Sequence, residues 1–378
     1  MSNEPEVIHY GLDGVVVDTS SISKVMPEIN SLVYRGYPVQ ELAEHCHFEE
    51  VAWLIWKGEL PNSKELAHFV STGRGQRALS KDLLDVIQKS PKTAHPMDVL
   101  RTAISFLAME DTEMDKTDAA TNLKRSISMM AKIPTMLAAF YRLRKGQEFI
   151  PPRSDLGFVE NFFHMVFGKV PAAEVVKAFE VSMILYAEHG FNASTFTART
   201  VVSSLSDIYS GVVGGIASLK GPLHGGANEA VMHMLLEIDE PSRAKDWMLK
   251  ALKEKRLVMG FGHRVYKNGD SRVPTMKKYA RKMAEFTGQS KWLDMEDILE
   301  ATMLEQKNIH PNLDFPSGPA YYMMGFDIDM FTPFFVMARI TGWTAHIMEQ
   351  LANNRLIRPL SKYTGPGERH VVPIAQRG

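Results

Sequence analysis

Apolar residues along most of this chain recur three or four positions apart, which places them on one face of a helix. Val51, Leu54 and Ile55, for example, share the face of a helix that begins after Phe48. The alternating pattern of a half-buried strand is rare, and the one β-prone run is the three valines at 15–17. The pattern therefore predicts an all-α fold with a short strand near the N-terminus.

Several of the predicted helices have recognisable starts. Pro96 opens one, and the apolar run at 173–186 predicts another that is largely buried. Asn192 stands where an N-cap residue would, because its side chain can accept hydrogen bonds from free amides of the first turn. The helix beyond Asn192 is expected to continue to Leu219. Thr332, followed by proline, marks the start of a long C-terminal helix.

Two breaks interrupt the helical pattern. One spans residues 146–157, and the other, residues 220–226, combines a proline with three glycines, which suits a hinge. Charged residues become denser after the second break, as in 245–256, which we interpret as a solvent-facing helix surface. At 378 residues the chain exceeds a comfortable single core. We therefore expect two domains, the smaller one lying roughly between Gly225 and Tyr322.

Composition and charge narrow the function. The chain has 43 basic and 44 acidic side chains and a net charge of −1, so we expect no long-range attraction to nucleic acid or anionic lipid. Cys46 is the only cysteine, which excludes intramolecular disulfides and cysteine-rich metal sites. Residues 1–6 are acidic, unlike a secretory signal, and the apolar stretch 331–351 contains Arg339 and other charged residues. We expect a cytoplasmic protein without a membrane span.

A histidine between proline and glycine is the first candidate for chemistry. His224 follows Pro222 in the second break and precedes two glycines, on a turn that leads into a helix starting near Ala227. The free amides at that helix start disfavour the imidazolium form, so a neutral His224 that donates a hydrogen bond fits this position. The structural alternative is a histidine that only caps the next helix.

A second histidine, His263, ends the sequence Gly260-Phe-Gly-His. The Gly-Lys-Ser/Thr of a nucleotide-binding P-loop is missing, so that kind of site is excluded. Clustered cations beside exposed backbone suit a ligand that carries phosphates. A glycine-rich turn between helices is the structural alternative. The surrounding basic residues are Lys253, Lys255, Arg256, Arg264, Lys267 and Arg272.

A sheltered carboxylate is the third candidate. Asp314 lies between Leu313 and Phe315, so its carboxylate is expected to be partly desolvated. Desolvation raises the pKa of a carboxylate and makes it a better proton acceptor near neutral pH. An Asx-turn ahead of Pro316 would be the structural explanation of the same residue.

Three further side chains lie in apolar or glycine-rich surroundings. Arg339 belongs to the apolar C-terminal helix and needs an anionic partner, for which Glu349 is a candidate. Arg358 has similar neighbours near the C-terminus, and His189 follows a buried helix beside a glycine, where it can face a cleft. Together with the preceding candidates, they suit metal-free proton abstraction beside a carbonyl on a phosphate-bearing carrier, with a small anionic substrate.

Seven segments of the chain form a recognisable set, in the order 34–39, 94–98, 187–195, 221–229, 260–266, 311–314, and 330–333 with Gly342-Trp343. Taken together they resemble the citrate synthase family, and the resemblance covers nearly the whole chain. Seven matches in order are far more specific than any one of them. The resemblance implies an all-α fold with a large domain of residues 1–224 and 324–378 and a small domain of residues 225–323 that closes over the substrate.

The resemblance also implies roles for the three candidates. Asp314 is similar to the family's base, which removes the α-proton of an acyl-CoA. His224 resembles the donor to the thioester oxygen, and His263 the donor to the ketone of oxaloacetate. The condensed thioester is then hydrolysed, and no cofactor or metal is expected.

Substrate ligands follow from the same resemblance. His189, Arg272 and Arg339 match oxaloacetate ligands, and Arg358 matches one supplied across a homodimer interface. Arg74 is a weaker candidate for a substrate contact. The segment matching the docking site of the CoA nucleotide consists of Arg256, Leu257, Val258, Met259 and Gly260.

The acyl group is less well determined by the sequence. Residues 187–192, 322–325 and 364–369 look closer to 2-methylcitrate synthases, which use propionyl-CoA, although Leu223 and Arg264 depart from some of those enzymes. The alternative is a citrate synthase of the tricarboxylic acid cycle that mainly uses acetyl-CoA. One methylene is worth only about 1 to 3 kcal/mol in a pocket, so both substrates can react.

Two other classes of function provide competing hypotheses. A metal-dependent lyase or hydrolase would use the three histidines and Asp314 as ligands, and a chelator would abolish its activity. The adjacent His45-Cys46-His47 is a poor metal site, because consecutive helical residues point in different directions. A non-catalytic helical interaction protein would bind no acyl-CoA.

Overall fold

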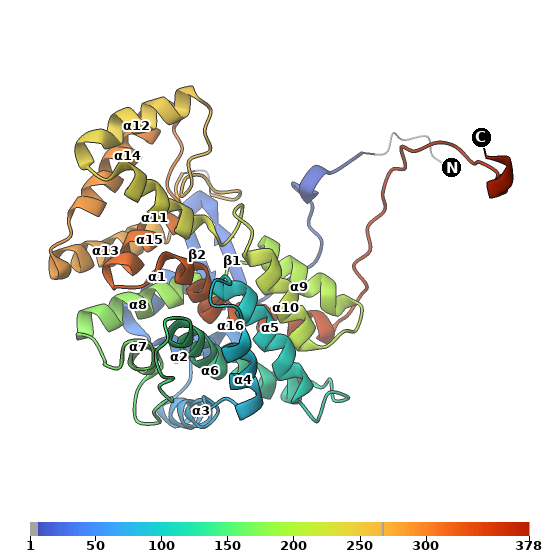
Figure 1. Cartoon of the computed structure of the whole chain (residues 1–378), viewed down its shortest axis with the longest axis horizontal. Coiled ribbons are helices and arrows are strands. Elements are labelled where there is room, and N and C mark those ends of the chain that lie inside the picture. The colour runs from blue at the N-terminus through green and yellow to red at the C-terminus, as the bar shows by residue number, and fades with distance from the viewer. Residues whose placement is uncertain (1–6, 267, 378) are drawn as a thin grey trace.

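The computed structural model describes residues 7–266 and 268–377, so the acidic start at 1–6 and Lys267 lie outside the described residues. The described residues form sixteen α-helices and one small sheet, which confirms the predicted all-α class (Figure 1). The helices are α1 (Val39–His45), α2 (Phe48–Lys57), α3 (Ser63–Gly75), α4 (Lys81–Lys89), α5 (Pro96–Met109), α6 (Ala119–Arg144), α7 (Phe158–Phe167), α8 (Ala173–Tyr186), α9 (Ala193–Ser203), α10 (Ile208–Leu219), α11 (Ala227–Ile238), α12 (Pro241–Lys253), α13 (Val273–Thr287), α14 (Lys291–Lys307), α15 (Asp314–Met323) and α16 (Phe331–Ala352).

Local sequence signals account for many of these boundaries. Helices α2, α5 and α8 begin where the apolar pattern and Pro96 predict. Asn192 caps α9, because its side-chain oxygen accepts the Thr195 amide at 3.0 Å. Helix α16 begins at Phe331, one residue before the predicted start. Both predicted breaks lie between helices.

Two predicted elements are wrong. Residues 15–17 form no strand, and Val16 is 89% exposed. The sheet is instead the antiparallel set β1 (Ser23–Met26), β2 (Ser31–Tyr34) and β3 (Tyr37–Pro38).

The single helix predicted from Asn192 to Leu219 is two helices, α9 and α10. The chain turns at Leu205, which has φ of +66°, a left-handed conformation that does not continue an α-helix. Asp207 then caps α10 by accepting the amide of Ser210 at 2.9 Å.

Helix α16 forms the centre of the helical body and packs against α2, α5, α6, α8, α9 and α10 (Figure 1). Almost all of its side chains are buried, including Trp343 and Arg339. No helix in the described part of the chain is long and apolar enough to cross a membrane. The apolar stretch at 331–351 is therefore a core helix, as its charged residues predict.

Helices α11 to α15 pack on one another, at the upper left of Figure 1, and the loop at 220–226 leads into them. They occupy the sequence range of the predicted small domain. Helix α13 also contacts α8 of the central body. The division of the chain into a large and a small domain stays a prediction, and so does closure between them.

Candidate active site

A cavity of about 1180 Å³ lies where α8, α9 and α16 meet the loops that precede α11, α13 and α15. It brings together residues that are far apart in the sequence, and most of the candidates from the sequence line it. The candidates in this cleft are His189, His224, Leu257, Val258, Met259, Gly260, His263, Arg272, Asp314 and Arg339.

Three candidates do not line the cleft. Arg74 lies on α3 and donates to the carbonyl of Ser154 at 3.3 Å. Arg256 is half-exposed and is paired with Glu237 at 2.7 Å, next to the cleft-lining residues 257–260. Arg358 is exposed in the segment that follows α16.

Asp314 is the first residue of α15 and faces the cleft. Burial raises its pKa to about 6, although a hydrogen bond from the Tyr186 hydroxyl to Oδ1, at 2.7 Å, opposes the shift. The sheltered aspartate predicted from its apolar neighbours is therefore confirmed. Tyr186 was not singled out in the sequence, because a tyrosine at the end of a buried helix usually belongs to the core.

His224 accepts hydrogen bonds on one nitrogen from Ser194, the second residue of α9. The backbone amide of Ser194 donates to Nε2 at 3.3 Å, and the Ser194 hydroxyl lies 2.8 Å from the same atom. An amide can only donate, so Nε2 carries no proton and the neutral ring holds its proton on Nδ1.

The neutral state expected for His224 fits its surroundings. Burial, followed by the charge of Arg339, lowers the pKa of His224 to about 3.

His263 has the opposite arrangement. Its Nδ1 accepts the backbone amides of Val265 at 3.0 Å and Tyr266 at 3.2 Å, which leaves the proton of the neutral ring on Nε2. Burial and the charge of Arg272 lower its pKa to about 4. The glycine loop therefore fixes one tautomer of a neutral imidazole, beside His189 at a ring-centroid distance of 5.0 Å.

Arg272 and Arg339, two of the arginines that line the cleft, differ in how their charge is balanced. Arg272 forms a double ion pair with Asp270, at 2.9 and 2.7 Å, and this carboxylate outweighs burial and raises the pKa of Arg272. Arg339 donates from Nε to the carbonyl of Tyr186 at 2.7 Å. Within the described residues its Nη1 is buried without a partner, and burial lowers its pKa to about 10.

The predicted pairing of Arg339 with Glu349 is wrong. Glu349 bonds Arg199 at 2.9 Å instead. Residues ten positions apart on a helix are separated by about 15 Å along its axis, which is too far for a hydrogen bond. Arg339 thus keeps a donor available for a bound anion. Nε2 of His189 is also buried without a partner among the described residues.

The described residues contain no group of three or more histidine, cysteine, aspartate or glutamate side chains arranged to hold a metal ion. His224 and His263 each accept backbone amides on one ring nitrogen. Of the His45-Cys46-His47 run, His47 pairs with Glu180 at 3.1 Å. The cleft brings together a proton acceptor, Asp314, two neutral imidazoles, His224 and His263, and the guanidinium groups of Arg272 and Arg339.

Comparisons with known proteins show the family of the chain. Residues 11–360 match the family model described as citrate synthase, C-terminal domain. The chain is 57% identical to a 2-methylcitrate synthase of Mycobacterium tuberculosis, over 97% of this chain and 92% of that protein. It is 56% identical to a citrate synthase of Mycolicibacterium smegmatis, over 98% of both chains.

Solved structures give the same result. The crystal structure of citrate synthase from Thermotoga maritima matches with a TM-score of 0.89 at 41% identity, covering 98% of this chain and 100% of that one. The ternary complex of a Thermoplasma acidophilum citrate synthase with carboxymethyl coenzyme A and oxaloacetate matches with a TM-score of 0.93 at 31% identity, covering 99% and 100%. The chain has the all-α citrate synthase fold, and it belongs to the citrate synthase family.

Proposed function

We propose that this protein condenses an acyl-CoA thioester with oxaloacetate and hydrolyses the condensed thioester, which releases CoA and 2-methylcitrate or citrate. One observation carries the proposal. A carboxylate of raised pKa, Asp314, shares a cleft with two imidazoles of lowered pKa, His224 and His263. The names of the relatives, which include both 2-methylcitrate synthases and citrate synthases, support it.

In the first step, Asp314 takes a proton from the α-carbon of the acyl-CoA. A pKa of about 6 leaves the carboxylate mostly ionised at neutral pH and still more basic than an ordinary aspartate. The electron pair left on carbon is delocalised to the thioester oxygen, to which Nδ1–H of His224 donates. A fixed donor aimed at developing negative charge lowers the barrier.

In the second step, the α-carbon attacks the ketone carbon of oxaloacetate. Nε2–H of His263 donates to the ketone oxygen and stabilises the negative charge that forms there. His189, Arg272 and Arg339 hold the carboxylates, because guanidinium groups match carboxylate geometry. The proton taken up by Asp314 returns to the former ketone oxygen, which gives the hydroxyl group of the product and restores the base. Water then attacks the thioester carbonyl, the C–S bond breaks, and CoA leaves as the thiol with one proton of that water, while its other proton passes to solvent.

The CoA moiety is proposed to lie along residues 257–260, which line the cleft beside Arg256. Leu257 is 68% exposed at this edge, so part of its surface is free to contact a ligand. Val258 and Gly260 anchor the segment, the latter packing against Val231 and Phe315 so closely that a Cβ would collide with both.

Propionyl-CoA is the proposed main substrate, and acetyl-CoA is the alternative. Release of CoA, followed with a thiol reagent, should require oxaloacetate. At fixed oxaloacetate, kcat/KM for propionyl-CoA divided by kcat/KM for acetyl-CoA should exceed one. One methylene in a hydrophobic pocket can be worth about 10- to 200-fold, which sets the upper range of this ratio. A ratio below one would identify acetyl-CoA as the preferred substrate, and oxaloacetate-independent release would contradict the condensation.

A homodimer in the cytoplasm is also part of the proposal. The segment after α16 extends away from the helical body (Figure 1) and exposes Leu360, Tyr363 and Val371, which are 88%, 75% and 85% accessible. Apolar side chains on an extended segment favour burial against another chain. Arg358 lies in this segment, so it is proposed to reach the cleft of a second copy.

Tyr186→Phe should shift the pH dependence of the reaction. The Tyr186 hydroxyl donates to Asp314 and lowers the pKa of that carboxylate, so its removal raises the pKa. The base must be ionised, and activity falls as pH drops through its pKa. The acidic limb of the kcat profile should therefore move to higher pH, measured between pH 5 and 9. A limb that stays in place, or moves to lower pH, would contradict this role of Tyr186.

A further inference from the structure

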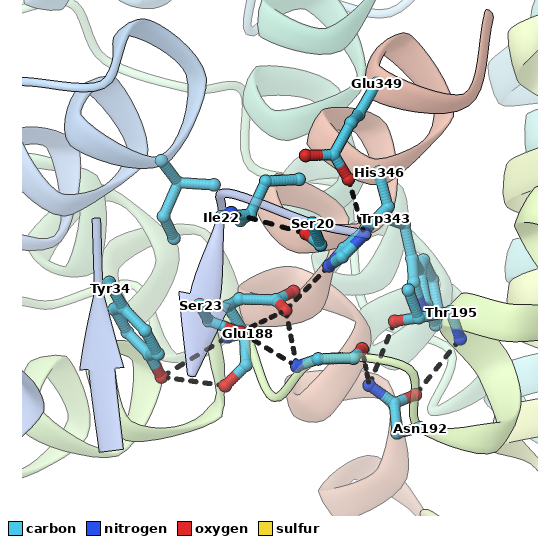
Figure 2. Close-up of polar contacts among 12 residues, drawn as sticks. Ser20, Ile22, Ser23, Tyr34, Glu188, Asn192, Thr195, Trp343, His346 and Glu349 are labelled. Carbon is cyan, nitrogen blue, oxygen red and sulfur yellow. Dashed lines mark hydrogen bonds and ion pairs between the residues drawn. The ribbon is translucent and has the colours of Figure 1, made fainter. Parts of the chain in front are cut away.

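The mechanism leaves one buried carboxylate beside the cleft unused. Glu188 precedes His189 and is 0% exposed. Three donors converge on its Oε1: the Ser23 hydroxyl at 2.9 Å, the Gly190 amide at 2.6 Å and Nε2 of His346 at 2.8 Å (Figure 2). The turn that carries His189 is therefore tied through one oxygen atom to β1 and α16.

The carboxylate of Glu188 is ionised. Burial alone would raise its pKa, but the interactions with His346 and Arg339 outweigh burial and lower it. An ionised carboxylate can only accept a hydrogen bond, so Nε2 of His346, 2.8 Å away, donates to Glu188.

The sheet holds the same residue through its backbone. The Tyr34 hydroxyl donates to the carbonyl of Glu188 at 3.0 Å, and the Glu188 amide lies 3.3 Å from the same hydroxyl oxygen. Ser23 and Tyr34 are directly opposite each other in the β1–β2 register, so one cross-strand pair contacts both the side chain and the main chain of Glu188 (Figure 2).

Charge connects Glu188 to the second ligand group. No carboxylate among the described residues is hydrogen-bonded to Arg339, and the negative charge that most favours its ionised form is that of Glu188. A buried guanidinium without any counter-charge is strongly destabilised. Glu188 thus acts on both His189, through the turn, and Arg339, through its charge.

We propose that Glu188 is a positioning residue for oxaloacetate: it fixes the turn that presents His189 and balances the charge of Arg339 before a dicarboxylate binds. The proposal rests on the proposed function for the identity of the dicarboxylate. Glu188 itself does not line the cleft, so it is proposed to act through His189 and Arg339.

Glu188→Gln tests the proposal with little change in volume. A neutral amide oxygen is a weaker acceptor for three donors. The new NH₂ group would lie where Oε2 lies now, a position without a hydrogen-bond partner among the described residues. This position is packed tightly against α16, since Oε2 lies where even a Cβ added to Gly342 would collide with it. We expect KM for oxaloacetate to rise about tenfold or more and kcat at saturating oxaloacetate to change less than about threefold, since binding of ground and transition states weakens alike.

Glu180→Gln is the matched control. Glu180 is another buried carboxylate of the same part of the chain, on α8, and it contacts His47 and the Phe48 amide rather than the cleft. Glu180→Gln should lose about as much thermal stability as Glu188→Gln, while its KM values for oxaloacetate and for the acyl-CoA stay unchanged. If loss of stability alone raised KM for oxaloacetate, KM would rise in both variants. A positioning role raises KM for oxaloacetate only in Glu188→Gln.

Calorimetric titration with oxaloacetate alone separates this inference from the proposed function, because it needs no turnover. Weaker binding by Glu188→Gln than by wild type supports the positioning role even if the reaction differs. Equal affinity of Glu188→Gln and wild type for oxaloacetate overturns it. Tighter binding by Glu188→Gln also overturns it, because that result is expected if Glu188 only repels the bound anion. If Glu188→Gln does not fold, Ser23→Ala removes one of the three donors, and an unchanged KM for oxaloacetate there overturns the proposal.

Discussion

Asp314→Asn is expected to lower kcat by about 10²- to 10⁴-fold, the range for loss of a general base. The amide of asparagine keeps the shape of the side chain and can accept the hydrogen bond from Tyr186, but it cannot take up a proton. Release of CoA from the acyl-CoA in the presence of oxaloacetate measures the loss. Turnover within a few-fold of wild type would remove Asp314 from the mechanism.

Loss of folding cannot explain the expected defect, because the same substitution should stabilise the protein. Burial raises the pKa of Asp314 from 3.8 to about 6. When the pKa of a carboxyl group is higher in the folded than in the unfolded protein, its protonated form stabilises the folded state at pH values below the unfolded-state pKa. This stabilisation is lost as pH rises through the folded-state pKa. At pH 8 the ionised carboxylate therefore disfavours folding, and Asp314→Asn should unfold at an equal or higher temperature than wild type.

Asp111→Asn is the matched control. Asp111 also accepts a hydrogen bond from a tyrosine, Tyr209 at 3.0 Å, but it pairs with Arg125 away from the cleft. Its pKa is lowered, because the interactions with Arg125 outweigh burial. Removing this charge should lower thermal stability and leave kcat nearly unchanged, the opposite pair of effects from Asp314→Asn.

The helices could be predicted where the sequence carries a local signal, such as the apolar spacing after Phe48 or the cap at Asn192. The break between α9 and α10 was missed because no glycine or proline marks it. Leu205 adopts the left-handed conformation there, which is unfavourable for a leucine and is imposed by the tertiary structure. The signal that was present is Asp207, an N-cap residue within a run rich in serine.

The site could be predicted only as far as unusual residues stand out in the sequence. Glycine neighbours marked His224 and His263, and apolar neighbours marked Asp314. The hydrogen bonds that select the tautomer of each histidine come from residues elsewhere in space or from backbone amides, which leave no pattern in the sequence. Glu188 was missed for a similar reason, since its partners are 165 residues upstream, in β1, and 158 residues downstream, in α16.

The tautomers of the two histidines predict opposite responses to the same pair of substitutions. The amide nitrogen of asparagine corresponds in position to Nδ1 of histidine, and that of glutamine corresponds to Nε2. At position 224 the proton is on Nδ1, because Nε2 accepts the Ser194 amide. At position 263 it is on Nε2, because Nδ1 accepts the amides of Val265 and Tyr266.

His224→Gln and His263→Asn should therefore each lose about 10²- to 10³-fold in kcat, the cost of removing one donor from a site of developing negative charge. His224→Asn and His263→Gln keep a neutral donor near the original atom and should lose less. The same two substitutions at His164, on α7 outside the cleft, serve as a control and should leave kcat unchanged. Equal losses of kcat for asparagine and glutamine at either position would contradict the tautomer assigned there. If asparagine lost more than glutamine at 224, and glutamine more than asparagine at 263, the donors would instead be Nε2 of His224 and Nδ1 of His263.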